Sequence, residues 1–285
     1  MKRPRPSSRQ GPSSRQGPSR RRRHRRATRQ KTRRAYRQRG GNPITFGIIG
    51  IFKNEAMGIR EWIEHYIWQG VDKILLLDNN STDNWRDAIK DIKDLDKYVT
   101  VKHAEKIHAQ DEHYNTLGWP WLKENNIKVV GILDLDEYMF GTDGKNLKQH
   151  VVEIFSAPNR PSRFSCNWTM FGSSGHDKQP ASIRKSFTMR MRELGKDVKT
   201  IAWVDDIKEG GLHLHTSHVI GNTIECPAGI QLNHYAIQSR EFFEKVKMSR
   251  GDAHSAKSNS VRDWTYFERY DFKDLEDRKL ADITP

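Results

Sequence analysis

Short apolar runs alternate with stretches of helical periodicity between residues 44 and about 155, and this alternation restricts the possible folds more than any other feature. The first run, 44–52, is apolar and β-branched, as a buried strand is. It precedes a helical face formed by Ile59, Trp62, Ile63, Tyr66 and Ile67. Further strands are predicted at 73–77, 98–103 and 128–133, with helices at 85–93 and, interrupted near Gly118, at 111–123. Strands that alternate with helices indicate a parallel sheet covered on both faces.

The pattern changes after residue 156. Short β-like runs rich in His, Trp and Gly are predicted as strands at 163–171, 200–204, 212–218 and 231–236. A helix is predicted at 241–249, and the charged residues 258–285 are predicted to be helical and peripheral. The body is therefore predicted to be a single α/β domain, with a mostly parallel sheet and a mixed, antiparallel C-terminal part.

The positive charge of the chain is concentrated in its first 40 residues. They hold 17 of the 50 Lys and Arg and no Asp or Glu, so 33 basic residues face 36 acidic ones in the remainder. This Arg-rich, repetitive segment has too few apolar side chains to offset the entropy of ordering, and we predict a disordered tail at 1–42. Such a tail can bind a polyanion, either nucleic acid or an anionic membrane surface, or it can be a solubilising extension.

The cysteine count and the hydropathy pattern exclude several classes of protein. Only Cys166 and Cys226 occur, which excludes a disulfide framework, and their spacing does not suggest a zinc site. The longest apolar stretch, 46–52, is too short to cross a bilayer, and no signal peptide pattern is present. We therefore predict no transmembrane segment and a reducing compartment, cytosolic or nuclear.

An acidic tetrad, Asp134-Leu135-Asp136-Glu137, directly follows the apolar run at 129–133. Ligands of open α/β sheets bind at the carboxyl ends of the strands. Two carboxylates one residue apart can hold Mg²⁺ or Mn²⁺ together with substrate phosphates. An ordinary acidic turn is the alternative, and a metal nuclease would need further acidic ligands, for which only Glu137 and Asp143 are near in sequence.

Five segments in the same order along the chain carry a family resemblance. They are 53–55 with 61–66, 70–83, 134–138, 171–176, and 233–235 with 239–251. Together they resemble glycosyltransferases of the GT-A type, in particular family 92 and related family 2-like members. The resemblance implies a GT-A (Rossmann-like) domain at 43–252, followed by a C-terminal helical extension at 253–285. It also implies a hexosyltransferase that moves a sugar, with galactose as one candidate, from a nucleotide-diphosphate sugar to a hydroxyl acceptor on a glycan, protein or lipid.

The resemblance also implies a metal site. Asp134, Asp136 and His234 are the expected ligands of Mn²⁺ or Mg²⁺, which would bridge the two phosphates of the donor. Glu137 is expected to orient one of these ligands. For His234, a core histidine satisfied by a hydrogen bond is the alternative interpretation.

The donor is expected to bind at the first two strand ends. Lys53, Asn54 and Glu55 follow the first strand, Asp78 ends the second, and Arg250 is the candidate for phosphate. For the segment 53–55, a polar loop that enters a helix is the alternative. Asp83 is interpreted as mainly structural, at the start of the next helix, with Ser81 as the competing N-cap.

Inversion at the anomeric carbon, which the resemblance implies, needs a base for the acceptor hydroxyl. Asp177, after the acceptor-side loop, and Asp205, after Trp203, are the candidates. His176 and His213 are further candidates, with a structural or exposed role as the alternative for both.

Two interpretations of the whole chain remain open. Animal members of the family usually carry a membrane anchor where this chain has its Arg-rich tail, which favours a cytoplasmic enzyme of bacterial or viral type. The alternative function is a nucleic-acid-binding protein that acts through the basic tail and has a catalytically inactive glycosyltransferase-like body.

Overall fold

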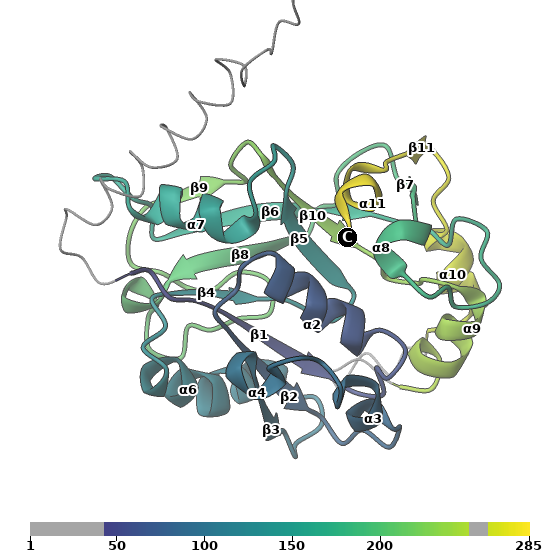
Figure 1. Ribbon diagram of the computed structural model, residues 1–285, viewed down its shortest axis with the longest axis horizontal. Helices are drawn as coiled ribbons and strands as arrows, with labels where there is room; N and C mark the ends of the chain where they lie inside the picture. Colours follow the sequence, from purple (N-terminus) through teal and green to yellow (C-terminus); the bar gives the residue numbers. More distant parts are fainter. Residues whose placement is uncertain (1–42, 251–261) are drawn as a thin grey trace, which may run out of the picture. The chain divides into compact units, whose positions relative to one another are not determined.

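The computed structural model describes residues 43–250 and 262–285, so the tail predicted at 1–42 lies outside the described residues. A nine-stranded sheet forms the centre of the described body (Figure 1), with the order β3-β2-β1-β4-β8-β6-β10-β5 and with β9 paired to β6. Its strands are β1 (Phe46–Phe52), β2 (Lys73–Asp78), β3 (Val99–His103), β4 (Val129–Ile132), β5 (Glu137–Gly141), β6 (Arg163–Met170), β8 (Val198–Trp203), β9 (Thr223–Glu225) and β10 (Ile230–His234).

The first half of the sheet is parallel and the second half is mixed. β1 pairs in parallel with β2 and β4, and β2 pairs in parallel with β3. β8 is antiparallel to both β4 and β6, whereas β10 is parallel to β6 and antiparallel to β5. The prediction of an α/β fold with a mostly parallel sheet and a mixed C-terminal part is confirmed.

Helices cover both faces of the parallel half because successive side chains of a strand point to opposite faces. Phe46 and Ile48 of β1 belong to one buried cluster, together with side chains of α2, α3 and α7. Ile49 and Ile51 belong to a second cluster, on the other face, with η1 and α6. Between residues 43 and 160 the helices are α2 (Ile59–Trp68), α3 (Trp85–Ile89), α4 (Leu95–Tyr98), α5 (Gln110–His113), the π-helical η1 (Tyr114–Gly118), α6 (Trp119–Glu124) and α7 (Leu147–Phe155).

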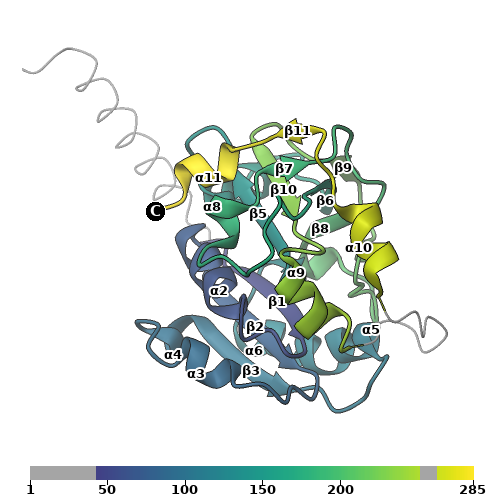
Figure 2. The same ribbon diagram turned by 90° about the vertical axis from the view of Figure 1, so that its right-hand side faces the viewer.

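The C-terminal elements pack against the body. The two-residue strands β7 (Met189–Arg190) and β11 (Leu275–Glu276) pair antiparallel. Figure 2 shows α10 near α9, and α11 beside α8. The helical elements of this part are α8 (Ile183–Ser186), the 3-10 helix η2 (Val204–Asp206), α9 (Arg240–Phe242), the π-helical η3 (Phe243–Lys247), α10 (Trp264–Tyr270) and α11 (Lys279–Ile283).

The structure differs from the sequence-based prediction at several segments, three of which bear on the cavity described below. The strand predicted at 212–218 is wrong, because this segment is a loop. The helix predicted at 241–249 is divided into α9 and η3. β5 is absent from the prediction, because it begins within the acidic tetrad and its apolar run, Tyr138–Met139–Phe140, is only three residues long.

A disulfide joins Cys166 of β6 to Cys226, which directly follows β9. The bond links two positions that are 60 residues apart in the chain. Disulfides form and persist in oxidising compartments and are rare in the cytosol. The cysteines therefore do not support the predicted reducing compartment, and the cytoplasmic location stays a prediction.

Among the residues that the structure describes, no helix combines the length and the apolar character that a membrane crossing requires.

Candidate functional site

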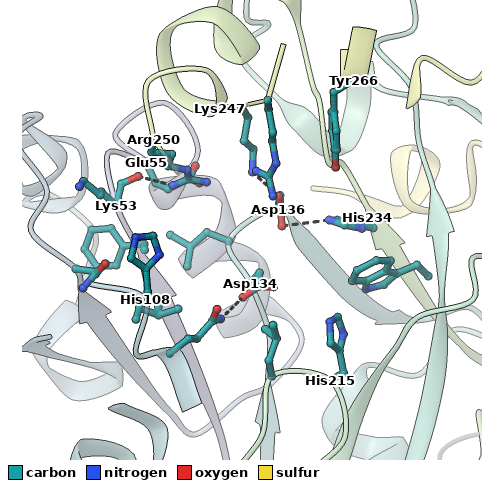
Figure 3. A pocket seen from close by; sticks show the side chains of 18 of the residues that line it. Lys53, Glu55, His108, Asp134, Asp136, His215, His234, Lys247, Arg250 and Tyr266 are labelled. Carbon is teal, nitrogen blue, oxygen red and sulfur yellow. Dashed lines mark hydrogen bonds and ion pairs between the residues drawn. The ribbon is translucent and has the colours of Figure 1, made fainter. Parts of the chain in front are cut away.

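A cavity of about 770 Å³ lies at the carboxyl ends of β1, β2 and β4. From these strand ends, Lys53, Glu55, Asn79, Asp134 and Asp136 contribute to its wall. The rest of the wall comes largely from the second half of the chain (Figure 3), including Trp168, His215, His234, Lys247, Arg250 and Tyr266. A cavity of this size suits a ligand as large as a nucleotide, and its position is the usual one for ligands of open α/β sheets.

Helix α2 holds the backbone of the acidic turn between β4 and β5. The indole Nε1 of Trp62 donates to the carbonyl oxygens of Asp134, at 2.8 Å, and Glu137, at 3.1 Å. The hydroxyl of Tyr66 donates to the carbonyl of Glu137, at 2.9 Å, and accepts the N–H of Met139, at 3.0 Å. The periodicity predicts Trp62 and Tyr66 only as apolar contacts, whereas their polar atoms also fix where the turn presents its carboxylates.

Asp136 faces two basic side chains inside the cavity. Nζ of Lys247 lies 2.5 Å from Oδ2 of Asp136, and Nε2 of His234 lies 3.5 Å from Oδ1. Burial favours the neutral acid, but Lys247 and then His234 outweigh it and hold the pKa of Asp136 well below its ordinary value. Lys247 is itself buried, on η3, and is not among the residues predicted from the sequence.

Asp134 and Glu137 share a second buried lysine. Nζ of Lys199, on β8, lies 2.7 Å from Oδ2 of Asp134 and 3.2 Å from Oε2 of Glu137. Glu137 also accepts the indole N–H of Trp168, at 2.7 Å, and the backbone N–H of Asp134, at 2.8 Å. Burial raises the pKa of the Glu137 carboxyl to about 7 against the opposing pull of Lys199. These contacts fix the Glu137 carboxylate beside Asp134, and the orienting role of Glu137 stays a prediction.

Asp136 and His234 fit a metal ion better than Asp134 does. Nδ1 of His234 is buried and has no hydrogen-bond partner among the described residues, while Nε2 faces the Asp136 carboxylate. Asp134 is engaged by Lys199 and also lies 3.3 Å from the amide of Gln110. Within residues 43–250 and 262–285, no group of three or more His, Cys, Asp or Glu is placed to hold a metal. Two protein ligands still suit an ion whose shell is completed by substrate phosphates and water.

Of the residues predicted for the donor, Lys53, Glu55 and Arg250 are brought together. All three line the cavity. The guanidinium of Arg250 donates to the carbonyl of Lys53 and pairs with the carboxylate of Glu55. A basic side chain thus ties the segment after η3 to the loop after β1.

Asn54 and Asp78 do not line the cavity, but they shape its loops. Asn54 has a left-handed backbone, with φ of 56°, and its side-chain oxygen accepts the N–H of Thr82 at 2.7 Å. Oδ1 of Asp78 accepts the N–H of Ser81 at 2.9 Å. Asp83 does not cap α3; its carboxylate accepts the N–H of the residue after Glu55, at 2.7 Å. These polar contacts join the loop after β1 to the loop after β2.

The structure does not bring the predicted bases to the cavity. The side chain of Asp177 is 84% exposed, with Arg240 at 3.8 Å, and that of Asp205 is 54% exposed, with Lys128 at 3.5 Å. Neither residue lines the cavity, and neither do His176 and His213.

Comparison with known proteins identifies one protein family that this chain matches. The family model described as glycosyltransferase family 92 matches residues 42–280. A glycosyltransferase family 92 protein of Ricinus communis is 24% identical over 225 residues, which cover 73% of this chain and 38% of that protein. One from Arabidopsis thaliana is 21% identical over 225 residues, covering 69% of this chain and 36% of that protein. Among solved structures, the crystal structure of HddC from Yersinia pseudotuberculosis has 11% identity and a TM-score of 0.41, covering 70% of this chain and 96% of that one.

This chain spans less than half the length of the curated relatives that it matches. The family model nevertheless covers well over half of this chain, including the parallel strands, the acidic turn and His234. The predicted α/β class is confirmed by the sheet, and the chain belongs to glycosyltransferase family 92.

Proposed function

We propose that this chain transfers a sugar from a nucleotide-diphosphate sugar to a hydroxyl group of an acceptor. The observation that carries the proposal is the pairing, in one cavity, of the acidic turn with Lys247, His234 and the neighbouring Arg250. Fixed cations in a cavity stabilise the negative charge of a departing diphosphate. Membership of family 92 supports the same activity.

We assign the nucleotide to the strand ends and the diphosphate to the basic side of the cavity. Lys53 and Glu55 line the part formed by the loop after β1, and Asn54 and Asp78 brace the loops that form it. Arg250 bridges this part to η3, so it can donate to a phosphate without leaving the cavity wall. Guanidinium groups suit phosphate because their donors form a planar fork.

We also propose that Asp136 and His234 hold Mn²⁺ or Mg²⁺, with Asp134 beside them. When bound, the metal would act as a Lewis acid on the phosphate oxygens of the donor. The backbone contacts of Trp62 with the acidic turn then matter, because they fix the direction of the carboxylates. Lys247 occupies one oxygen of Asp136, so the metal and the ammonium compete for the same carboxylate.

Galactose as the transferred sugar, inversion at the anomeric carbon, and a glycan, protein or lipid acceptor are finer proposals that rest on the family resemblance. Binding of nucleic acid or an anionic membrane by the tail is a separate proposal, because residues 1–42 lie outside the described part. The cavity and its charges favour an enzyme over a protein that acts through the tail alone.

A thermal-shift experiment with uridine and guanosine diphosphate sugars, with and without Mn²⁺, tests the proposal. A ligand of the native state raises the melting temperature by mass action, so a matching donor raises it most when Mn²⁺ is present. Asp136→Asn is expected to lose the Mn²⁺-dependent part, whereas Asp143→Asn, a partly exposed carboxylate outside the cavity, keeps it. The proposal fails if no nucleotide sugar is bound and none is turned over to free nucleotide and sugar product. The metal assignment alone fails if Asp136→Asn retains the full effect of Mn²⁺.

A further inference from the structure

An inverting transfer needs a base near the acceptor hydroxyl, and the carboxylates of the cavity are already engaged by cations. Asp134 pairs with Lys199, Asp136 with Lys247, and Glu55 with Arg250. A carboxylate paired with a cation is a weaker base than a free one, because the cation favours its charged form. The histidines of the cavity wall are therefore the remaining candidates for the base.

His215 has a ring nitrogen with the right properties. Figure 3 shows its ring directed into the cavity that Asp134, Asp136 and His234 also line. Its Nδ1 lies 3.3 Å from the backbone carbonyl oxygen of Val198, at the start of β8. A carbonyl oxygen only accepts, so the neutral ring carries its proton on Nδ1, and Nε2 is left with a lone pair.

The loop at 212–218 is held so that this ring keeps its place. The backbone N–H of His215 and that of Thr216 both donate to Nδ1 of His213, at 3.2 and 3.3 Å. The N–H of Leu214 donates to the carboxylate of Asp111 at 2.9 Å. The polar residues that look like a strand in the sequence are instead the anchors of a loop that presents His215.

Trp168 separates His215 from the assigned metal ligand. Its ring centroid lies 5.5 Å from that of His215 and 4.2 Å from that of His234. The two histidines thus contact one indole at different positions of the cavity wall. Displacement at an anomeric carbon uses such a separation, because the attacking hydroxyl and the departing phosphate lie on opposite sides of that carbon.

The surroundings of His215 favour the neutral form of its ring near pH 7. Burial, followed by the Lys199 ammonium, lowers the pKa of the ring, while the Val198 carbonyl, Asp197 and Asp134 act in the opposite direction. A neutral imidazole can accept a proton without first losing one.

We propose that His215 is the general base of the reaction, a proposal that rests on glycosyl transfer being the function. Nε2 takes the proton of the acceptor hydroxyl while the acceptor oxygen forms a bond to the anomeric carbon. The bond from that carbon to the phosphate oxygen breaks, and its electron pair leaves with the diphosphate. The imidazolium then returns its proton to solvent.

The variant His215→Asn distinguishes a role of His215 as general base from a purely structural role. The side-chain amide of asparagine has a donor close to the position of Nδ1, so the bond to the Val198 carbonyl can be kept, but it cannot take up a proton. Transfer to the acceptor is expected to fall by about 10²- to 10⁴-fold, the usual contribution of a general base. The rise in melting temperature with nucleotide and Mn²⁺ is expected to be unchanged. His218→Asn, an exposed residue of the same loop, is the matched control and should keep full transfer.

The pH profile and an NMR measurement complete the test. The wild-type rate should fall as the pH drops through the pKa of His215, and this acidic limb should be missing in His215→Asn. Nitrogen-detected NMR of the wild-type rings should show His215 protonated on Nδ1 and neutral at pH 7, a result that does not depend on turnover. The proposal is overturned if the ring carries its proton on Nε2, or if His215→Asn transfers sugar at the wild-type rate. It is also overturned if His108→Asn, on the same cavity wall, removes the acidic limb and His215→Asn does not. Absence of turnover in the wild type would instead count against the proposed function.

Discussion

Replacement of Lys247 by methionine tests the electrostatics of the cavity most directly. The change keeps most of the length of the side chain and removes the ammonium that lies 2.5 Å from Asp136. Removal of one partner of a buried ion pair costs about 3–5 kcal/mol, because the other charge stays buried without compensation. Asp136 retains the neighbouring His234 and borders the cavity, so we expect the lower end, about 3 kcal/mol.

The assay is denaturant unfolding at pH 7, supported by the melting temperature, which should fall by about 2–4 °C per kcal/mol for a domain of this size. Lys245→Met is the matched control: it lies on the same π-helical turn, but its side chain is 62% exposed and solvent screens its pair with Glu241, so the change should leave stability nearly unaltered. Mn²⁺ should stabilise Lys247→Met more than it stabilises the wild type, because no ammonium competes for Asp136. Equal stability of the two variants would refute the buried pair. An equal effect of Mn²⁺ on wild type and Lys247→Met would refute the competition.

Three further predictions concern other parts of the chain. Asp177→Ala and Asp205→Ala should transfer sugar at nearly the wild-type rate, because both side chains lie outside the cavity. A large loss of activity in either variant would indicate that its aspartate is the general base. Reduction of the disulfide should lower the free energy of unfolding by about 4 kcal/mol, as expected for a closed loop of 60 residues. A mass measurement that shows two free thiols in the protein before reduction would contradict the presence of the disulfide. Asp277→Asn should destabilise the protein at pH 7 and cost less at lower pH: although burial opposes them, Lys279 and then Arg190 hold the pKa of Asp277 below its ordinary value. A carboxyl whose pKa is lowered by folding stabilises the protein at pH values above its ordinary pKa, and this stabilisation is lost as the pH falls through its pKa in the folded protein. The prediction is wrong if the difference in unfolding free energy between wild type and Asp277→Asn does not shrink below about pH 4.

The sequence predicts those parts of the fold whose pattern lies within one short segment of the chain. The parallel half follows from alternating periods of two and about 3.6 residues, which a single segment of chain displays by itself. The position of the acidic tetrad after β4 is predictable for the same reason. The prediction fails at 212–218, where apolar and histidine residues alternate as in a strand, but the ring of His213 accepts the backbone N–H groups of His215 and Thr216 in its own loop.

The remaining parts of the site depend on pairs that are distant in the sequence. Lys199 meets Asp134 across 65 residues, and Lys247 meets Asp136 across 111. Taken alone, a lysine in the middle of a strand or at the end of a helix is usually a solvated side chain, so neither position carries a local signal. The disulfide presents the same difficulty, since two cysteines do not reveal from their spacing that two strands bring them together.

The two buried lysines also bear on how this site can accept its ligands. Three carboxylates, those of Asp134, Asp136 and Glu137, lie near one another, and like charges this close resist ionisation unless cations accompany them. Lys199 is fully buried between two of them and has no access to the cavity, so it is a permanent counter-charge. Lys247 lines the cavity and can exchange the Asp136 carboxylate for a phosphate oxygen without leaving its helix. The diphosphate of a nucleotide sugar carries two negative charges, so a divalent ion that arrives with it adds equal positive and negative charge, and this exchange leaves every carboxylate and phosphate with a cation beside it. We therefore expect the affinity for Mn²⁺ to be higher with the nucleotide-diphosphate sugar than without it in the wild type, and this dependence to weaken in Lys247→Met.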